Sequence, residues 1–410
     1  MADTRTAVAV RPQPLGAFPL PAGYLLVPAG EDTEAARSAL LAGRLPDPWP
    51  ERMRGHALAL AGDRAGALAA MSGEDVVTRY NRFVLDSDGV DKGALREELG
   101  DLGPLVDLVS FMLDNAESPP DLATADDEIG ALVLSAQAAH AQAGGDFAET
   151  LRLLDEAAAM AEPVSPPLAG FMLGAAASLC QENGLGDGVE RLEKALKALA
   201  GADDLRIGRA ELHLSLAGAL HGLAERQPHQ LARAIPHYHT TLQLVMSGEA
   251  PELWASAHAN LATAYLTMPM VEASDRLRLG VAVQSLRNAL KVYTRETHPE
   301  RWASTQLNLA NSLVYTPSKH QADNLVEAVE LYEAVLETRD READPIGRAR
   351  LLSNQGNVLA HLGMFDHAKA KLCEARFLFE EFADDDSVRA VRGVLDEVAR
   401  QQTVSKGDRR

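Results

Sequence analysis

Apolar residues in this chain recur every three or four positions, which is the spacing that buries one face of an α-helix. The run NLVEAVELYEAVLETR places Leu325, Val329, Tyr332 and Leu336 on one face, with the small Ala328 among them. Polar stretches such as TPSKHQAD separate runs of this kind. The pattern predicts a succession of amphipathic helices joined by polar loops.

One helical segment occurs twice in closely similar form. PELWASAHANLA begins at Pro251, and PERWASTQLNLA begins at Pro299. PIGRARLLSNQG from Pro345 and RIGRAELHLSLAG from Arg206 align with these two segments. Proline suits the first turn of a helix, where its missing N–H leaves no bond unmade. A helix–turn–helix unit that recurs at this period predicts an α-solenoid.

The last unit, GNVLAHLGMFDHAKAKLCEA, resembles a tetratricopeptide repeat (TPR). Gly356 stands at the close-packing position of the first helix, and Ala368 stands at the small position of the second. Leu372 and Ala375 complete the spacing, and Gly363 closes the turn. The later units have a longer period and resemble kinesin-light-chain-type repeats. The resemblance implies an all-α fold, a right-handed α-solenoid of stacked antiparallel helix pairs.

The same pattern predicts how the chain is divided. We expect a disordered or extended N-terminal segment at 1–30, a divergent helical region at 31–125 with one TPR-like pair near 50–72, a TPR-like array at 126–384, a capping helix at 385–402 and a tail at 403–410. The units of the array are expected to start near 126, 165, 206, 251, 299 and 345. Repeat arrays need a terminal cap to cover the last apolar face.

Asparagine recurs at one position of three successive first helices, at Asn260, Asn308 and Asn354. An amide side chain carries both a donor and an acceptor. The resemblance implies that first helices line a concave groove, where such a row can bind the backbone of an extended peptide. A bond to a neighbouring helix across the repeat interface is an equal alternative. The predicted groove residues are Asn260, Thr263, Ser304, Asn308, Asn311, Arg350, Asn354 and Asn357.

Two tryptophans, Trp254 and Trp302, head adjacent first helices of the array. An exposed aromatic side chain there would suit an anchor for a partner protein. Packing between repeats at the helix start is the alternative interpretation, and we favour it.

Charge and motifs narrow the chemistry. The net charge of −20 disfavours duplex nucleic acid and anionic membranes, which bind cationic surfaces. The sequence contains no GxxxxGK[ST], HExxH or GxSxG motif, and GLGDG at 184–188 reads as a turn between helices. The two cysteines, Cys180 and Cys373, are far apart, and the histidines between 213 and 258 are scattered. We therefore expect no catalytic residues, no metal and no cofactor.

These observations favour a non-catalytic scaffold, adaptor or assembly factor that binds a partner protein or an extended peptide in the concave groove. We expect it in the cytoplasm, because the chain shows no signal peptide and no apolar run of about 18 residues. Homo-oligomerisation is compatible with the sequence. The alternatives are a regulator that senses a peptide or small molecule, and an enzyme whose site lies in the first 125 residues. The sequence does not name the partner.

Overall fold

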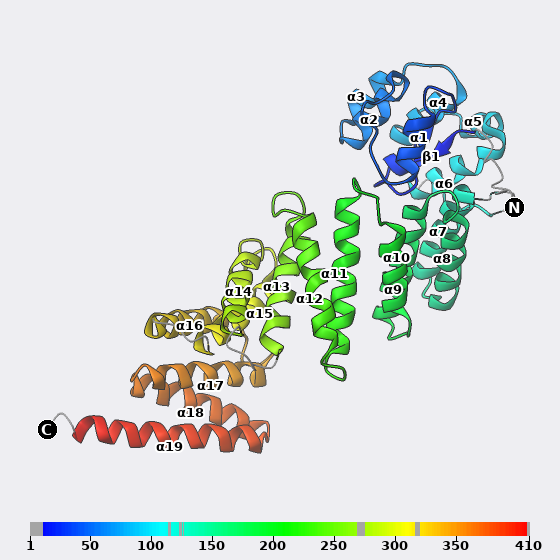
Figure 1. Ribbon diagram of the computed structural model, residues 1–410. Coiled ribbons are helices and arrows are strands. Elements are labelled where there is room, and N and C mark those ends of the chain that lie inside the picture. Colours follow the sequence, from blue (N-terminus) through cyan, green and yellow to red (C-terminus); the bar gives the residue numbers. More distant parts are fainter. Residues whose placement is uncertain are drawn as a thin grey trace, which may run out of the picture. The chain divides into compact units, whose positions relative to one another are not determined.

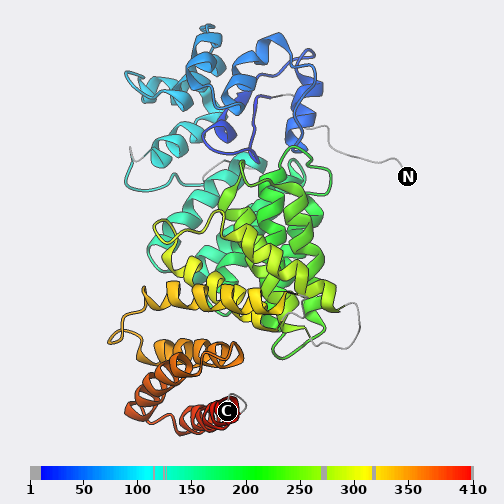
Figure 2. The ribbon, with the colours of Figure 1, turned by 90° about the vertical axis from the view of Figure 1, so that its left-hand side faces the viewer.

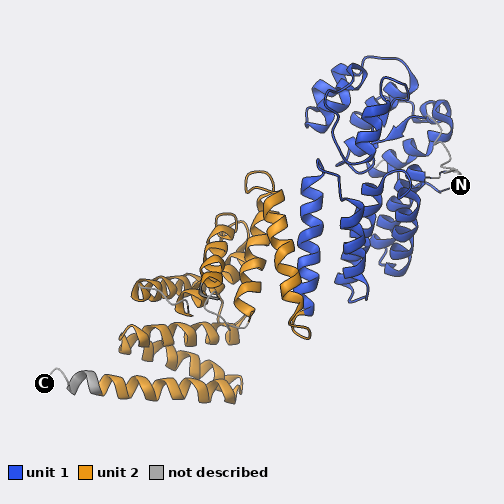
Figure 3. Ribbon diagram, in the orientation of Figure 1, with its two compact units in different colours: residues 1–223 blue, residues 224–410 orange. Residues whose placement is uncertain are grey.

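The computed structural model describes residues 11–113, 116–122, 125, 127–268, 275–315 and 320–407. The chain divides into two compact units, residues 1–223 and residues 224–410 (Figure 3). Helices make up most of both units, and the described residues contain only two short strands. The all-α class is therefore confirmed.

Unit 1 combines a small N-terminal region with stacked helices. Its elements are β1 (Gln13–Pro14), η1 (Ala22–Tyr24), β2 (Leu26–Val27), α1 (Glu34–Leu41), η2 (Glu51–Met53), α2 (Arg54–Leu60), α3 (Arg64–Ala70), α4 (Val76–Leu85), α5 (Lys92–Leu99), η3 (Gly100–Leu102), α6 (Pro104–Met112), α7 (Asp127–Ala143), α8 (Phe147–Ala161), α9 (Pro166–Glu182), α10 (Gly188–Ala198) and α11 (Arg206–Leu223). Within this unit α7 packs on α8 and α9 packs on α10, and the four helices run side by side (Figure 1).

Residues 11–30 are folded rather than extended or disordered. Strands β1 and β2 pair antiparallel, with Gln13 opposite Val27. The backbone of Leu26 is held by the buried side chain of Asn81, which accepts from its N–H at 2.7 Å and donates to its carbonyl at 2.8 Å. The expectation for this segment is wrong because a side chain 55 positions away satisfies its backbone groups. Residues 1–10 of the expected segment lie outside the described residues.

A helix pair occupies the place where one is expected near 50–72. Helices α2 and α3 pack on each other, and the carboxylate of Asp63 caps α3 by accepting from the N–H of Gly66 at 2.8 Å. Gly55 allows the close approach, since a Cβ there would lie 3.2 Å from the carbonyl oxygen of Ala67. Unit 1 continues past residue 126 through α11, so the boundary between the compact units falls after Leu223 and not where the array was expected to begin. The polar connection AERQPH separates α11 from the helix that follows.

Unit 2 consists of successive helices. They are α12 (Gln230–Leu244), α13 (Pro251–Thr267), α14 (Asp275–Ala289), α15 (Pro299–Tyr315), α16 (Gln321–Leu336), α17 (Pro345–His361), α18 (Phe365–Glu381) and α19 (Asp385–Gly407). Each packs on the next, and α17, α18 and α19 lie as layers in both views (Figures 1 and 2). The first helices therefore begin where the repeated prolines stand.

Small residues mark the crossings within these pairs. A Cβ added to Gly356 would lie 2.7 Å from the side chain of Leu372 and 3.3 Å from the carbonyl oxygen of Ala368. Ala310 of α15 and Ala328 of α16 are both fully buried in the shared core. Helices approach this closely only where small side chains face each other. Stacked helix pairs are thus confirmed, while the right-handed sense of the solenoid stays a prediction.

Helix α19 covers the end of the core in unit 2. The helix buries three of its valines in this core, Val388, Val391 and Val398, and its remaining surface is largely polar. The helix ends at Gly407, so residues 403–407, which were expected to be a tail, extend the cap. Residues 408–410 lie outside the described residues.

Candidate binding groove between α13 and α15

A pocket of about 400 Å³ lies between α13 and α15, which are the first helices of successive repeats. Four predicted groove residues form part of its wall, namely Asn260 and Thr263 from α13 and Ser304 and Asn308 from α15. The rest of the wall comes from Ser256, Ala259, Tyr293, Glu300, Arg301 and Thr305. The structure therefore brings half of the predicted set into one pocket.

The two asparagine side chains in the wall are free to bind. Neither Asn260 nor Asn308 has a side-chain hydrogen-bond partner among the residues that the structure describes. The hydroxyl of Thr263 instead donates to the carbonyl of Ala259 in its own helix at 3.0 Å. Thr305 does the same with the carbonyl of Arg301 at 2.6 Å. The two amides are thus available to a ligand, while the two threonine hydroxyls bond their own helices.

Tyr293 shapes one side of the pocket from the segment after α14. Its ring is buried, with 2% exposed, and its hydroxyl lies 2.7 Å from the hydroxyl of Ser256. The guanidinium of Arg301 donates to the same phenol at 3.5 Å and lies 5.5 Å from the ring centroid. The aromatic ring therefore orients Arg301 beside the pocket.

Asn311 is used inside its own repeat. Its carbonyl oxygen accepts from the hydroxyl of Tyr332 on α16 at 2.5 Å. Burial raises the pKa of Tyr332, so the phenol stays protonated and remains a donor. Asn311 therefore has a structural partner within its own repeat, and the expected alternative of a bond across the repeat interface is not what this contact shows.

The polar row continues on α17, but its members are not part of the wall of this pocket. Arg350 and Asn354 are exposed and Asn357 is half-buried. Among the described residues none of the three has a side-chain hydrogen bond or ion pair. They stay predicted binding residues for a ligand long enough to extend past α15.

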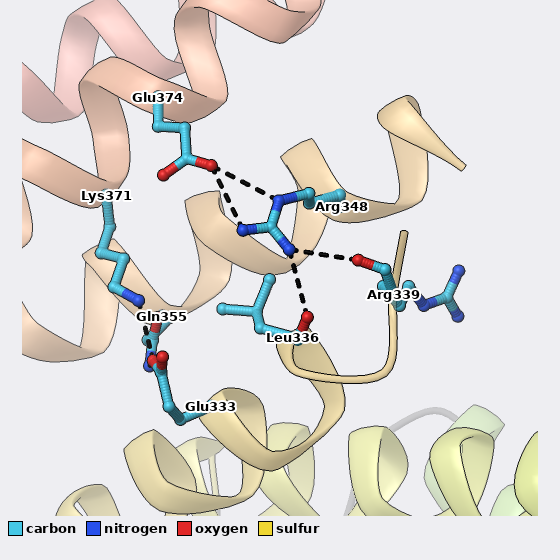
Figure 4. Close-up of polar contacts among 7 residues, drawn as sticks. All are labelled: Glu333, Leu336, Arg339, Arg348, Gln355, Lys371 and Glu374. Carbon is cyan, nitrogen blue, oxygen red and sulfur yellow. Dashed lines mark hydrogen bonds and ion pairs between the residues drawn. The ribbon is translucent and has the colours of Figure 1, made fainter. Parts of the chain in front are cut away.

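A second polar cluster connects α16, α17 and α18 (Figure 4). One guanidinium nitrogen of Arg348 donates to the carbonyls of Leu336 and Arg339, both at 3.1 Å. Two others lie 3.4 Å from one carboxylate oxygen of Glu374. Leu336 is the last residue of α16, and Arg348 adds a second donor to its carbonyl, which also accepts from the N–H of Arg339 at 3.3 Å.

Gln355 extends this cluster along the helices (Figure 4). Its side-chain nitrogen donates to the carboxylate of Glu333 at 2.7 Å, and the ammonium of Lys371 donates to the same oxygen at 2.7 Å. The hydrogen bond from Lys371, and to a smaller extent that from Gln355, holds the pKa of Glu333 below its ordinary value. These bonds between helices indicate a structural role for the cluster, although the buried Oε1 of Gln355 has no hydrogen-bond partner among the described residues.

Both tryptophans are half-buried and pack within unit 2. The ring of Trp254 meets that of His258 edge-on, with centroids 4.4 Å apart. Trp302 contacts buried residues of two neighbouring core clusters. These contacts favour the packing interpretation. Burial lowers the pKa of His258 to about 4, so this imidazole is neutral at physiological pH.

Sequence reasoning missed Tyr293, Glu300 and Arg301. The sequence did contain a signal for Arg301, because the aligned position in the preceding repeat is the apolar Leu253. Tyr293 gave no signal, since it lies in a connection outside the periodic runs. Within the described ranges there is no group of three His, Cys, Asp or Glu side chains placed to hold a metal ion. In the same part of the chain no helix is long and apolar enough to cross a membrane.

The helix pairs and their small-residue crossings define the class of protein: an all-α chain built of TPR-like units. No family model matches the sequence, and no curated protein matches it. Among solved structures, the chain is similar to the TPR domain of P58(IPK), at 15% identity over 87% of this chain and 99% of that one, with a TM-score of 0.27. At so low a TM-score the class rests on the helix pairs themselves and not on this likeness.

Proposed function

We propose that this protein is a non-catalytic interaction scaffold that binds an extended segment of a partner protein at the pocket between α13 and α15. One observation carries the proposal. The amides of Asn260 and Asn308 occupy the same repeat position on successive helices, line one pocket and have no partner among the described residues.

An extended peptide offers what these amides need. Its backbone presents an N–H and a carbonyl at every residue other than proline, and each must find a partner when it leaves water. An asparagine supplies one acceptor and two donors, so it can satisfy both backbone groups at once. Contacts of this kind hold a segment without reading its side chains, which suits an adaptor or assembly factor.

A regulator that senses a small molecule is the second candidate. The volume of about 400 Å³ lies within the range of small-molecule pockets. Such pockets are mostly apolar, however, and this wall contains Ala259 as its one purely aliphatic side chain. Every other side chain of the wall carries a polar group that can hydrogen-bond a peptide backbone, and this favours the peptide. The net charge of −20 points away from nucleic acid and anionic membranes, and we place the protein in the cytoplasm.

The test is capture of partners from the host lysate with the full chain and with the double variant Asn260→Ala, Asn308→Ala. The matched control is Gln243→Ala with Asn324→Ala, two amides of unit 2 that are not in the pocket wall. Peptide scanning of a captured partner then locates the bound segment. A partner that the double variant loses and the control keeps, with a short segment that competes, supports the proposal. A partner that the double variant retains contradicts it.

A further inference from the structure

Two opposite charges line the pocket, and neither is neutralised by the protein. Glu300 and Arg301 are consecutive residues in the first turn of α15, and both belong to the pocket wall. Among the described residues neither forms an ion pair. We infer that the segment bound at this pocket carries an acidic and a basic side chain close together, the acid beside Arg301 and the base beside Glu300. This inference rests on the proposed function.

Eight described arginines of unit 2 lie within 4 Å of a carboxylate, namely Arg287, Arg295, Arg339, Arg348, Arg376, Arg389, Arg392 and Arg400. Arg301 does not. Among the described residues its guanidinium has a hydrogen bond and a ring contact to Tyr293 alone. In a chain with a net charge of −20 a carboxylate partner is easy to supply from within. Its absence here leaves the guanidinium available to a carboxylate of the ligand.

Glu300 differs in the same way from its counterpart in the preceding repeat. Glu252 also stands in the first turn of its helix, and its carboxylate lies 3.4 Å from a ring nitrogen of His298. A glutamate in the first turn stabilises the helix dipole, which accounts for its position in both repeats. That effect does not need a partner, and it leaves the carboxylate of Glu300 free to accept from a cation.

A ligand with both charges fits the pocket better than a ligand with one. A purely anionic segment is repelled by the carboxylate of Glu300. A purely cationic segment leaves the Arg301 guanidinium unpaired as water is excluded. A neighbouring pair of opposite charges satisfies both and adds no net charge, so the negative field of the protein does not repel it. Charge-assisted hydrogen bonds are the stronger ones, and each matched charge should change affinity about 5- to 30-fold.

The test uses the full chain and four peptides of about 12 residues, enough to pass across one pocket in extended form. The peptides share a Gly, Ser and Ala background and differ at two neighbouring central positions, which read Glu-Lys, Glu-Gln, Gln-Lys or Gln-Gln. Fluorescence anisotropy at low salt gives the four affinities. The Glu-Lys peptide should bind most tightly and Gln-Gln most weakly.

Variants of the protein should separate the two charges. Arg301→Gln should abolish the preference for Glu and keep that for Lys, and Glu300→Gln should do the reverse. Arg301→Lys keeps the charge and should keep the preference for Glu. The controls Arg226→Gln and Glu330→Gln remove equal charges outside the pocket wall and should change none of the preferences.

The outcomes distinguish this inference from the function on which it rests. Equal affinity for all four peptides overturns the inference and leaves the proposed function standing. The inference is also overturned, and the proposed function still stands, if none of the four peptides binds but the segment found by partner capture binds. A lower melting temperature of Arg301→Gln with unchanged preferences shows a structural role and also overturns the inference. The proposed function fails on a separate result: the double variant Asn260→Ala, Asn308→Ala captures as much partner as the unmodified chain.

Discussion

The pocket between α13 and α15 and the contact of α17 with α16 and α18 belong to successive repeats of unit 2. In the first, Asn260 and Asn308 keep their amides free, and Arg301 has no carboxylate. In the second, Arg348 stands at the repeat position of Trp302 and binds two carbonyls and Glu374. One region therefore leaves its polar groups open, while the other uses them to bind α16 of the preceding repeat and α18 of its own.

The difference shows how a repeat can change role without changing fold. Both regions keep the proline at the helix start and the small residues at the crossing, which set the backbone. A few positions between these fixed points decide whether polar groups are satisfied internally. Leu309 on α15 becomes Gln355 on α17, and the amide then joins Glu333 and Lys371. On our proposal the pocket between α13 and α15 binds the ligand, and the Arg348 cluster stabilises the contact of α17 with its neighbours.

The largest expected effect on stability is in the closed region. Arg348→Ala removes the side-chain donor of the Arg339 carbonyl and one of two donors of the Leu336 carbonyl, together with the contact to Glu374, and should cost about 2 kcal/mol. Arg350→Ala, two residues further along the same helix, removes an exposed arginine without an ion pair and should change stability by less than about 0.5 kcal/mol. Calorimetric melting of the full chain gives both values. Equal losses for the two variants would contradict a structural role for the Arg348 cluster.

A smaller loss is expected at Asn311, the row member that the structure uses for packing. Asn311→Ala removes the acceptor of the Tyr332 hydroxyl, whose residue is 1% exposed, and should cost about 1–2 kcal/mol. Tyr332→Phe in the Asn311→Ala background should add little, because the unpaired hydroxyl is then gone. Thermal melting of the two single variants and the double variant gives the stabilities needed for this double-mutant cycle. Additive losses would show that the two side chains do not act as a pair.

The smallest effect is the pH dependence from Glu333. Its pKa is lowered in the folded state, so the folded protein binds fewer protons there than the unfolded chain does. The stabilisation is present above the unfolded pKa of about 4.3 and is lost as pH falls through the lowered folded pKa. Because the side chain is 51% exposed, the effect should be under about 1 kcal/mol. Glu333→Gln should flatten the acid limb of stability against pH, and an unchanged limb would contradict this assignment.

The sequence predicts the backbone of the array better than its polar contacts. Proline at 251, 299 and 345 and the helical apolar period locate the first helices, because both act within a few residues. The small residues at 356 and 368 likewise predict a close crossing. The folding of residues 11–30 could not be foreseen, since it depends on Asn81 reaching the backbone of Leu26.

The candidate site was predictable in part for the same reason. The repeat period alone places Asn260 and Asn308 at equal positions on successive helices. Whether an amide on that row is free or paired depends on a side chain of another helix, as Tyr332 shows for Asn311. Tyr293 and the ring contact that orients Arg301 come from a connection with no repeat signal. Periodicity therefore predicts which positions share a face, and tertiary contacts decide what each one does.

The central claim is that the amide of Asn308 serves a ligand and not the fold. The direct test is Asn308→Ala, with the melting temperature of the full chain and its affinity for the captured partner segment measured on the same sample. The account predicts an affinity lower by about 1–3 kcal/mol, roughly 5- to 150-fold, because backbone groups of the segment lose their partner in the pocket. The melting temperature should stay unchanged, since no described residue bonds this amide. A lower melting temperature with unchanged affinity would contradict the claim.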